Sequence, residues 1–112
     1  MSATKLNYLR QGSGSPPIVF VHGFLCRHQD WKHQVEYFSK NHDVIACDLP
    51  GHGESPAEES ISAKSIGAAV ARLLDDLDLH GTVLVGHSMG CRFVMEARRQ
   101  AKERVAGLVL LD

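Results

Sequence analysis

Thr82-Val83-Leu84-Val85-Gly86-His87-Ser88-Met89-Gly90 is the stretch that decides the fold. Its first four residues are an apolar, largely β-branched run typical of a strand. Residues 86–90 follow as a Gly-x-Ser-x-Gly turn, and residues 91–102 have the character of a helix. Gly86 and Gly90 suit such a sharp turn, because a Cβ atom at either position would collide with neighbouring backbone.

Ser88 is the candidate nucleophile at the tip of this turn. A serine in that strained position is lifted clear of the sheet, and the N–H groups that open the following helix point toward the same place. An oxyanion formed during acyl transfer would lie there. The alternative is a glycine-rich connection with an incidental serine, and the flanking strand and helix favour the catalytic interpretation.

The composition limits the classes of partner. A chain of 112 residues can form one domain, spanning residues 1–112, and its net charge of -1 comes without a long basic or acidic run. We therefore expect a small-molecule partner and no nucleic acid. No metal site and no cofactor are expected, since Cys26, Cys47 and Cys91 form no ligand pattern and read as reduced thiols. No hydrophobic signal core and no apolar run of membrane-spanning length is present, so we expect no membrane association and a cytoplasmic location.

Strand-like and helix-like segments alternate along the chain. Strands are predicted over residues 5–10, 18–22, 44–48, 83–87 and 105–111, and helices from Asp30 to about residue 40, from Ser62 to about residue 79, and over 91–102. This alternation predicts an α/β fold with a mostly parallel sheet, flanking helices and right-handed crossovers. Ligands bind at the carboxyl ends of the strands in such sheets, where His22, Asp48 and Ser88 fall.

Three motifs together resemble the α/β hydrolase fold. They are His22-Gly23-Phe24 after the first buried strand, the run from Asp48 to Ser55 after the second, and Gly86-His87-Ser88-Met89-Gly90 at the turn, in the family's order and spacing. The resemblance covers nearly the whole chain. Among family members the chain is most similar to the small intracellular esterases, with cofactor-free perhydrolases, enol-lactone hydrolases and carbon–carbon bond hydrolases close by.

The resemblance implies a serine hydrolase acting on a carboxylic ester or related acyl substrate. Ser88 would be the nucleophile, and the N–H groups of Phe24 and Met89 would form the oxyanion hole. A serine at this position also argues against the dehalogenase and epoxide-hydrolase branches, which use an aspartate nucleophile. The candidates for lining the substrate pocket are His22, Gly23, Leu25 and His87.

The chain departs from the family pattern after the turn. In the family the triad acid and histidine follow the serine, whereas here only residues 105–112 remain after the last helix and no histidine lies beyond His87. We expect an incomplete domain without the last strands, the cap region and the triad histidine, and therefore little activity from the isolated chain. The alternative is a non-catalytic module that binds a ligand or a partner chain. Its open edge over residues 105–111 predicts self-association or pairing with a complementing chain.

Several single residues have a structural interpretation that competes with a catalytic one. His22 is expected to brace the oxyanion loop rather than act as a base, and His87 to be turned away from the serine. Asp48 is expected to hold the turn that follows it. Asp112 occupies a position where some relatives place the triad acid, although most use a later one. Cys91 is expected to fill a packing position in the first turn of its helix.

Overall fold

Five strands form one sheet in the computed structural model, which describes residues 4–23, 28–49 and 62–111. The strand order is β1-β3-β2-β4-β5, with β1 antiparallel to β3 and the other neighbours parallel. The bounds are Tyr8–Gln11 for β1, Ile18–Val21 for β2, Val44–Cys47 for β3, Thr82–His87 for β4 and Val105–Leu111 for β5. The predicted mostly parallel α/β sheet is confirmed.

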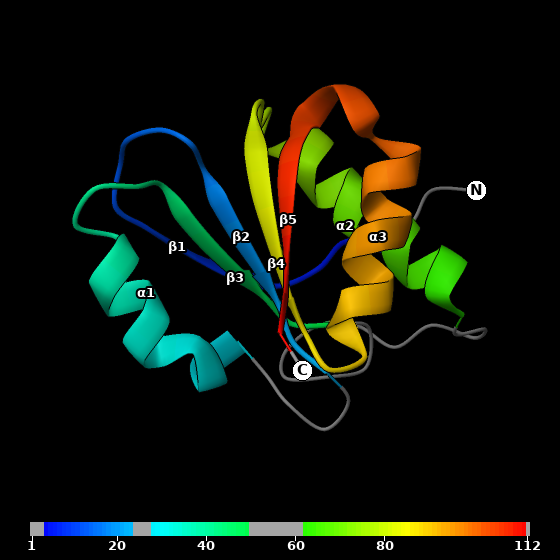
Figure 1. Ribbon diagram of the computed structural model, residues 1–112, viewed down its shortest axis with the longest axis horizontal. Coiled ribbons are helices and arrows are strands. Elements are labelled where there is room, and N and C mark those ends of the chain that lie inside the picture. The colour runs from blue at the N-terminus through cyan, green and yellow to red at the C-terminus, as the bar shows by residue number, and fades with distance from the viewer. Residues whose placement is uncertain (1–3, 24–27, 50–61, 112) are drawn as a thin grey trace.

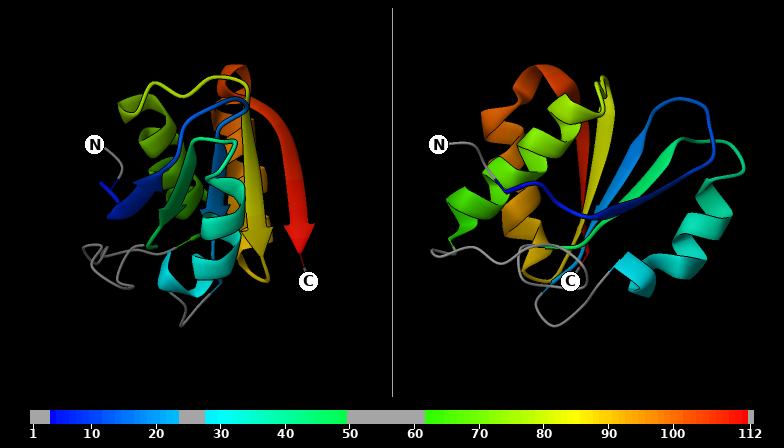
Figure 2. Two further views of the ribbon diagram at one scale, coloured as in Figure 1. Left: turned by 90° about the vertical axis from the view of Figure 1, so that its left-hand side faces the viewer. Right: turned by 180° about the vertical axis from the view of Figure 1, so that it is seen from behind.

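Helices lie on both faces of this sheet (Figure 1). The short 3-10 helix η1 and helix α1 lie on one face, and α2 and α3 lie side by side on the other, as the turned views also show (Figure 2). A second 3-10 helix, η2, leads into β5. The bounds are His28–Trp31 for η1, Lys32–Phe38 for α1, Ala63–Asp76 for α2, Gly90–Gln100 for α3 and Lys102–Arg104 for η2.

Two apolar cores result from this sandwich. Successive residues of a strand point to opposite faces, so the fully buried strand β2 supplies both cores and reads as an unbroken apolar run. One core lies under α2 and α3, the other under η1 and α1. The first includes Val19, Val21, Ile45, Ile66, Val70, Leu74, Leu84, Phe93 and Val94, and the second includes Ile18, Phe20, Trp31, Val35, Val44 and Val85.

The starts of α1 and α2 differ in how well the sequence predicts them. Ser62 caps α2 as expected: its side chain accepts from the backbone N–H of Ser65, whose hydroxyl accepts from the N–H of Ser62. Asp30 was predicted to cap α1, and this is wrong. Asp30 lies inside η1, and Trp31 precedes α1 without a side-chain cap. The 3-10 turn places the Trp31 ring in the core, 4.8 Å from the ring of Phe20 between centroids.

All three predicted helix ends are too late. α1 ends at Phe38 rather than near residue 40. α2 ends at Asp76 rather than near residue 79, because Asp78 has a left-handed backbone with φ of 50° that cannot continue a helix. α3 ends at Gln100, and Lys102 belongs to η2. Each helix therefore ends two or three residues earlier than the sequence predicted.

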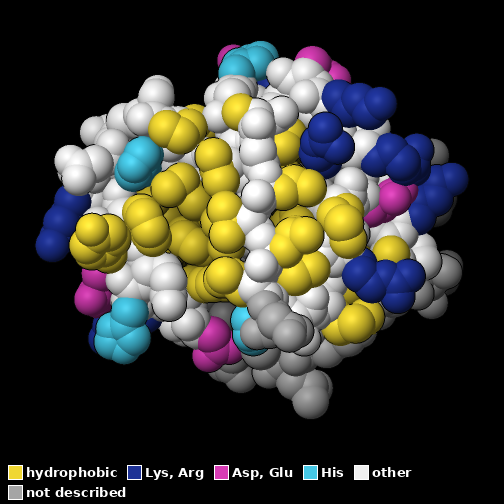
Figure 3. Space-filling model, viewed as in Figure 1, with side chains coloured by type: hydrophobic (Ala, Val, Ile, Leu, Met, Phe, Trp, Pro, Cys, Tyr) yellow, Lys and Arg dark blue, Asp and Glu magenta, His cyan; other side chains and the backbone are white. Residues whose placement is uncertain are grey.

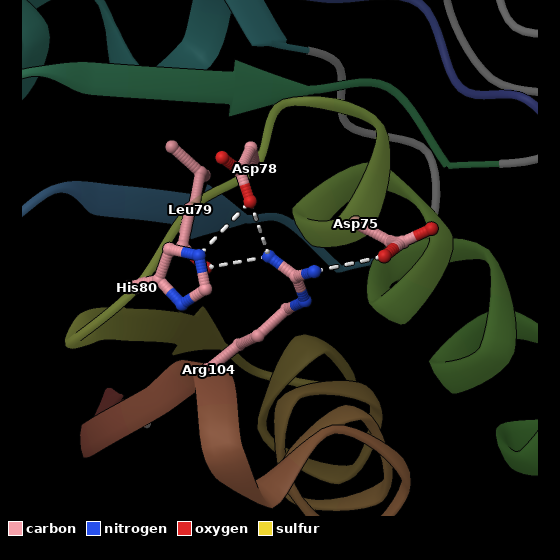
Figure 4. A network of polar contacts seen from close by, with 5 residues as sticks. All are labelled: Asp75, Asp78, Leu79, His80 and Arg104. Atoms are coloured by element: carbon pink, nitrogen blue, oxygen red, sulfur yellow. Dashed lines mark hydrogen bonds and ion pairs between the residues drawn. The ribbon is translucent and has the colours of Figure 1, made fainter.

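An ion-pair network joins the end of α2 to the segment before β5 (Figure 4). The guanidinium of Arg104 donates to Asp75 at 2.9 Å, to Asp78 at 3.3 Å and to the carbonyl of Leu79 at 3.2 Å. The ring of His80 lies 2.9 Å from the same Asp78 carboxylate. Hydrogen bonds, first from His80 and then from Arg104, lower the pKa of Asp78. The network fixes where β5 begins.

Strand β5 forms an apolar edge of the sheet. Within the described residues it pairs only with β4, and Val109, Leu110 and Leu111 remain 42%, 50% and 40% exposed. Hydrophobic side chains gather on both sides of this strand on the face seen in Figure 3. β1, at the other edge, has Arg10 paired to Asp43. None of the described helices is long and apolar enough to cross a membrane.

Candidate active site

The backbone of Ser88 has the strained conformation expected of a nucleophile turn. β4 ends at His87 and α3 begins at Gly90, so the serine occupies the tight connection between them. Its φ of 57° lies in the left-handed region, and its side chain is exposed. A residue with a Cβ atom adopts this region at a cost of about 1–2 kcal/mol, which the surrounding contacts must offset.

The two glycines of the turn allow three backbone segments to approach closely. A Cβ atom on Gly86 would lie 2.6 Å from the carbonyl oxygen of Gly90 and 2.8 Å from the nitrogen of Cys91. A Cβ atom on Gly90 would collide with the carbonyl oxygen of Val21 and lie 2.9 Å from that of His22. Glycine is thus required at both positions, as the sequence predicted, because α3 begins directly against the end of β2.

The end of β2 also lies against the serine itself. A Cβ atom on Gly23 would lie 3.2 Å from Cβ of Ser88 and 3.5 Å from the backbone nitrogen of Met89. The N–H groups that open a helix have no acceptor within it, and Met89 directly precedes α3. The geometry brings Gly23, Ser88 and Met89 together. Phe24 and Leu25, the other residues predicted for this loop, lie outside the described residues.

His22 is buried, at 1% exposure, and its ring joins two strand ends. Nδ1 lies 2.6 Å from the carbonyl oxygen of Gly23, and the N–H of Leu49 donates to Nε2 at 3.1 Å. The second bond assigns the tautomer, since Nε2 accepts and Nδ1 must donate. Both ring nitrogens contact backbone, an arrangement that suits bracing better than contact with a substrate.

Asp48 is fully buried at the end of β3, but its described partner is not the turn that follows it. Its Oδ2 accepts from Nδ2 of Asn7 at 2.9 Å, and its N–H donates to the carbonyl of Asn7 at 2.9 Å. The turn that Asp48 was predicted to hold lies within residues 50–61, outside the described residues. The described hydrogen bonds connect the end of β3 to the segment before β1.

His87 precedes the serine and lies on the face covered by η1 and α1. Its ring meets that of Trp31 edge to face, with centroids 6.1 Å apart, and its side chain is exposed. The contact with Trp31 agrees with the expected packing role, and a place for His87 in a substrate pocket stays a prediction. Asp112, the candidate triad acid, lies outside the described residues. Its neighbour Leu111 ends β5, and the carbonyl of Leu111 accepts from the N–H of Ser88 at 2.9 Å.

The two described cysteines have different surroundings. Burial is the main reason that the pKa of Cys47 rises to about 12, and its thiol lies 3.6 Å from the carbonyl of Phe20. Cys91 is half-buried, and its sulfur lies 3.4 Å from the carbonyl of Gly86 and 3.3 Å from that of Leu111. The sequence pattern predicted packing for Cys91 but not these bonds, because backbone carbonyls leave no signal in the sequence.

No metal centre is evident in the described part of the chain. Within residues 4–23, 28–49 and 62–111, no group of three histidine, cysteine or acidic side chains is placed to hold a metal ion.

The family comparison matches residues 16–112 to the alpha/beta hydrolase fold. One relative is the dihydrolipoyllysine-residue acetyltransferase component of the acetoin cleaving system from Pseudomonas putida. It is 39% identical over 101 residues, which cover 89% of this chain and 27% of that protein. The (E)-2-((N-methylformamido)methylene)succinate hydrolase of Acinetobacter baylyi is 38% identical over 85 residues, covering 75% of this chain and 32% of that protein.

Among solved structures, a thermophilic esterase from Thermogutta terrifontis is 34% identical and superposes with a TM-score of 0.87. The match covers 94% of this chain but 39% of the esterase. The chain thus spans about a third or less of the curated relatives named above and about two fifths of this structure. From the matched model, these relatives and the strand–turn–helix geometry at Ser88, we conclude that the chain belongs to the alpha/beta hydrolase fold family.

Proposed function

We propose that the chain is the nucleophile-bearing part of a serine hydrolase that acts on carboxylic esters or related acyl compounds. The observation that carries this proposal is the conformation of Ser88, left-handed and exposed between β4 and α3. The approach of Gly23 to Ser88 and to the nitrogen of Met89 supports it, because an oxyanion beside the serine would meet that amide.

In the proposed reaction, Oγ of Ser88 attacks the substrate carbonyl and forms a tetrahedral oxyanion. The N–H of Met89, together with that of Phe24, stabilises the negative charge. Collapse expels the alcohol and leaves an acyl-serine, which water then hydrolyses to release the acid. The proton of Ser88 passes to a base. Since the ring nitrogens of His22 contact Gly23 and Leu49, we propose that a complementing chain supplies that base.

The relatives support the same kind of chemistry. The esterase from Thermogutta terrifontis and the hydrolase from Acinetobacter baylyi are hydrolases by name, and the acetoin-cleaving component is an acetyltransferase by name. An esterase and an acetyltransferase both transfer an acyl group to a nucleophile, which for the esterase is finally water. For this chain an ester is the substrate class that we propose first.

A fluorophosphonate probe tests the proposal, because it phosphonylates an activated serine. Because the base lies outside this chain, we expect slow labelling of the chain and none of Ser88→Ala. Ser39→Ala, which changes a half-buried serine just after α1, should be labelled like the parent. Hydrolysis of p-nitrophenyl acetate should follow the same order. Loss of the triad histidine costs on the order of a millionfold in turnover, so labelling is the more sensitive readout. Equal labelling of Ser88→Ala would overturn the proposal.

A second candidate function is a non-catalytic module that pairs through β5. The exposed apolar side chains of β5 favour it, as does the 39% coverage of the esterase, which shows that the same fold there includes much more chain. The occupant we propose is a segment that supplies the next strand of the hydrolase sheet. A folded chain that binds such a segment while Ser88 stays unlabelled both with and without it would support this function over catalysis.

A further inference from the structure

Three elements meet at the carbonyl of Leu111, the last described residue of β5. This oxygen accepts from the N–H of Ser88 at 2.9 Å and lies 3.3 Å from the sulfur of Cys91 in the first turn of α3. The same sulfur lies 3.4 Å from the carbonyl of Gly86 in β4. The Cys91 thiol thus lies within hydrogen-bond distance of one carbonyl in β4 and one carbonyl in β5.

One of the groups bound at the Leu111 carbonyl, Ser88, has a strained backbone conformation. Ser88 holds a φ of 57°, and its N–H needs a fixed acceptor to keep that orientation. The acceptor lies at the end of an edge strand whose last three residues are substantially exposed, and strand ends of this kind open readily. The Cys91 thiol is a second donor to the Leu111 carbonyl. Its hydrogen bond would oppose opening of the strand at the acceptor of the Ser88 N–H.

We propose that Cys91 is a positioning residue for Ser88. Its thiol holds the Leu111 carbonyl, and that carbonyl holds the N–H and hence the backbone orientation of the serine. The inference deepens the proposed function and rests on it for its catalytic meaning. A cysteine that merely filled space would contribute through volume alone, so its donor hydrogen would be dispensable.

Hydrogen exchange at the Ser88 amide, followed by NMR, separates these two roles without requiring activity. A thiol is a weak hydrogen-bond donor, so its loss should have a modest effect. We expect Cys91→Ala to speed exchange of the Ser88 amide about three- to fivefold. Cys91→Ser keeps a donor and should stay near the parent rate. The N–H of Val83, bonded to Pro17 at the opposite end of β4, should exchange at the same rate in all three proteins.

The result that would overturn the proposal is equal exchange at Ser88 in the parent and Cys91→Ala, or an equal increase in the alanine and serine variants. If Cys91→Ala does not fold, Cys91→Val replaces it, because valine fills the site and also lacks a donor.

The rate of fluorophosphonate labelling tests whether the contacts of Ser88 and Cys91 with the Leu111 carbonyl affect the reactivity of the serine. We expect it to fall about three- to fivefold in Cys91→Ala and to be restored in Cys91→Ser. A parent chain that exchanges as expected but is never labelled would refute the proposed hydrolase activity of this chain and leave the positioning of Ser88 by Cys91 intact. Unchanged labelling in Cys91→Ala, with a labelled parent, would refute the positioning role.

Discussion

Ser88 and the glycines around it show how single residues fix this site. A left-handed serine is costly, and it persists because α3, β2 and β4 approach within distances that only glycine permits. The sequence predicted the glycine requirement from the Gly-x-Ser-x-Gly pattern. It did not predict the Leu111 carbonyl as the acceptor for the N–H of Ser88, because that contact depends on the β4–β5 register.

Gly90→Ala should destabilise the protein strongly. The new Cβ would collide with the carbonyl oxygen of Val21, a backbone atom of a central strand that cannot move aside. Overpacking of this kind typically costs about 1–3 kcal/mol in the free energy of unfolding, measurable by urea denaturation. Gly107→Ala is the matched control, since a Cβ there meets nothing within 4 Å. Equal midpoints for the two variants would contradict this account of the turn.

Cys47 should make stability depend on alkaline pH. Burial raises the pKa of its thiol to about 12 from the ordinary 9.0, so the folded state retains a proton that the unfolded state loses. The stabilisation is complete below about pH 9 and decreases as pH rises toward the folded pKa, by up to about 1.4 kcal/mol per pH unit. Urea unfolding near pH 8 and near pH 10 should show this decrease in the parent beyond that of Cys47→Ala. Parallel losses in the two proteins would rule it out.

At the scale of the element, the sequence predicts what is periodic and misses what depends on tertiary contact. The apolar stripe of α2 and the serine cap at its start follow from local rules, and both are present. The start of α1 does not follow from local rules. Asp30 is a residue type that caps helices well, but here it lies inside η1. Burial of Trp31 against Phe20 outweighs a cap that contributes only about 1 kcal/mol.

Ser62→Ala should weaken the start of α2. The substitution removes the hydroxyl that accepts from the N–H of Ser65, so one amide of the first turn loses its acceptor. We expect a loss of about 0.5–2 kcal/mol in the free energy of unfolding, measured by urea denaturation. Lys64→Ala lies in the same turn and should cost little, because its side chain is exposed and alanine favours the helix. A larger loss from Lys64→Ala would contradict the capping assignment.

At the scale of the whole molecule, the two edges of the sheet differ. β1 is antiparallel and has a charged side chain paired at its edge, whereas β5 is parallel and apolar on both faces. The sequence predicted the open β5 edge from its apolar run. Its placement of residues 23–24 beside Ser88 came from the family resemblance and not from local pattern, because the approach of Gly23 to Ser88 joins residues 65 positions apart through the β2–β4 pairing.

Exposed β5 should cause concentration-dependent association of the chain. Its apolar side chains and unpaired backbone groups favour pairing with another copy when nothing else covers them. Leu110→Lys should shift the sedimentation-velocity distribution toward the monomer, since a lysine on an edge strand opposes pairing. Leu9→Lys on β1, a position also exposed at 40%, is the matched control and should leave association unchanged. A monomeric parent at all concentrations would contradict the expectation.

The ring of His22 bridges the chain after β2 and the chain after β3. It contacts the carbonyl of Gly23 on one side and the N–H of Leu49 on the other, and Gly23 lies against Ser88. A displacement of the chain after β3 would therefore pass through a rigid imidazole to the glycine beside Ser88. Substitutions in the segment after Leu49 should consequently change the environment of Ser88, even where no changed side chain reaches the serine.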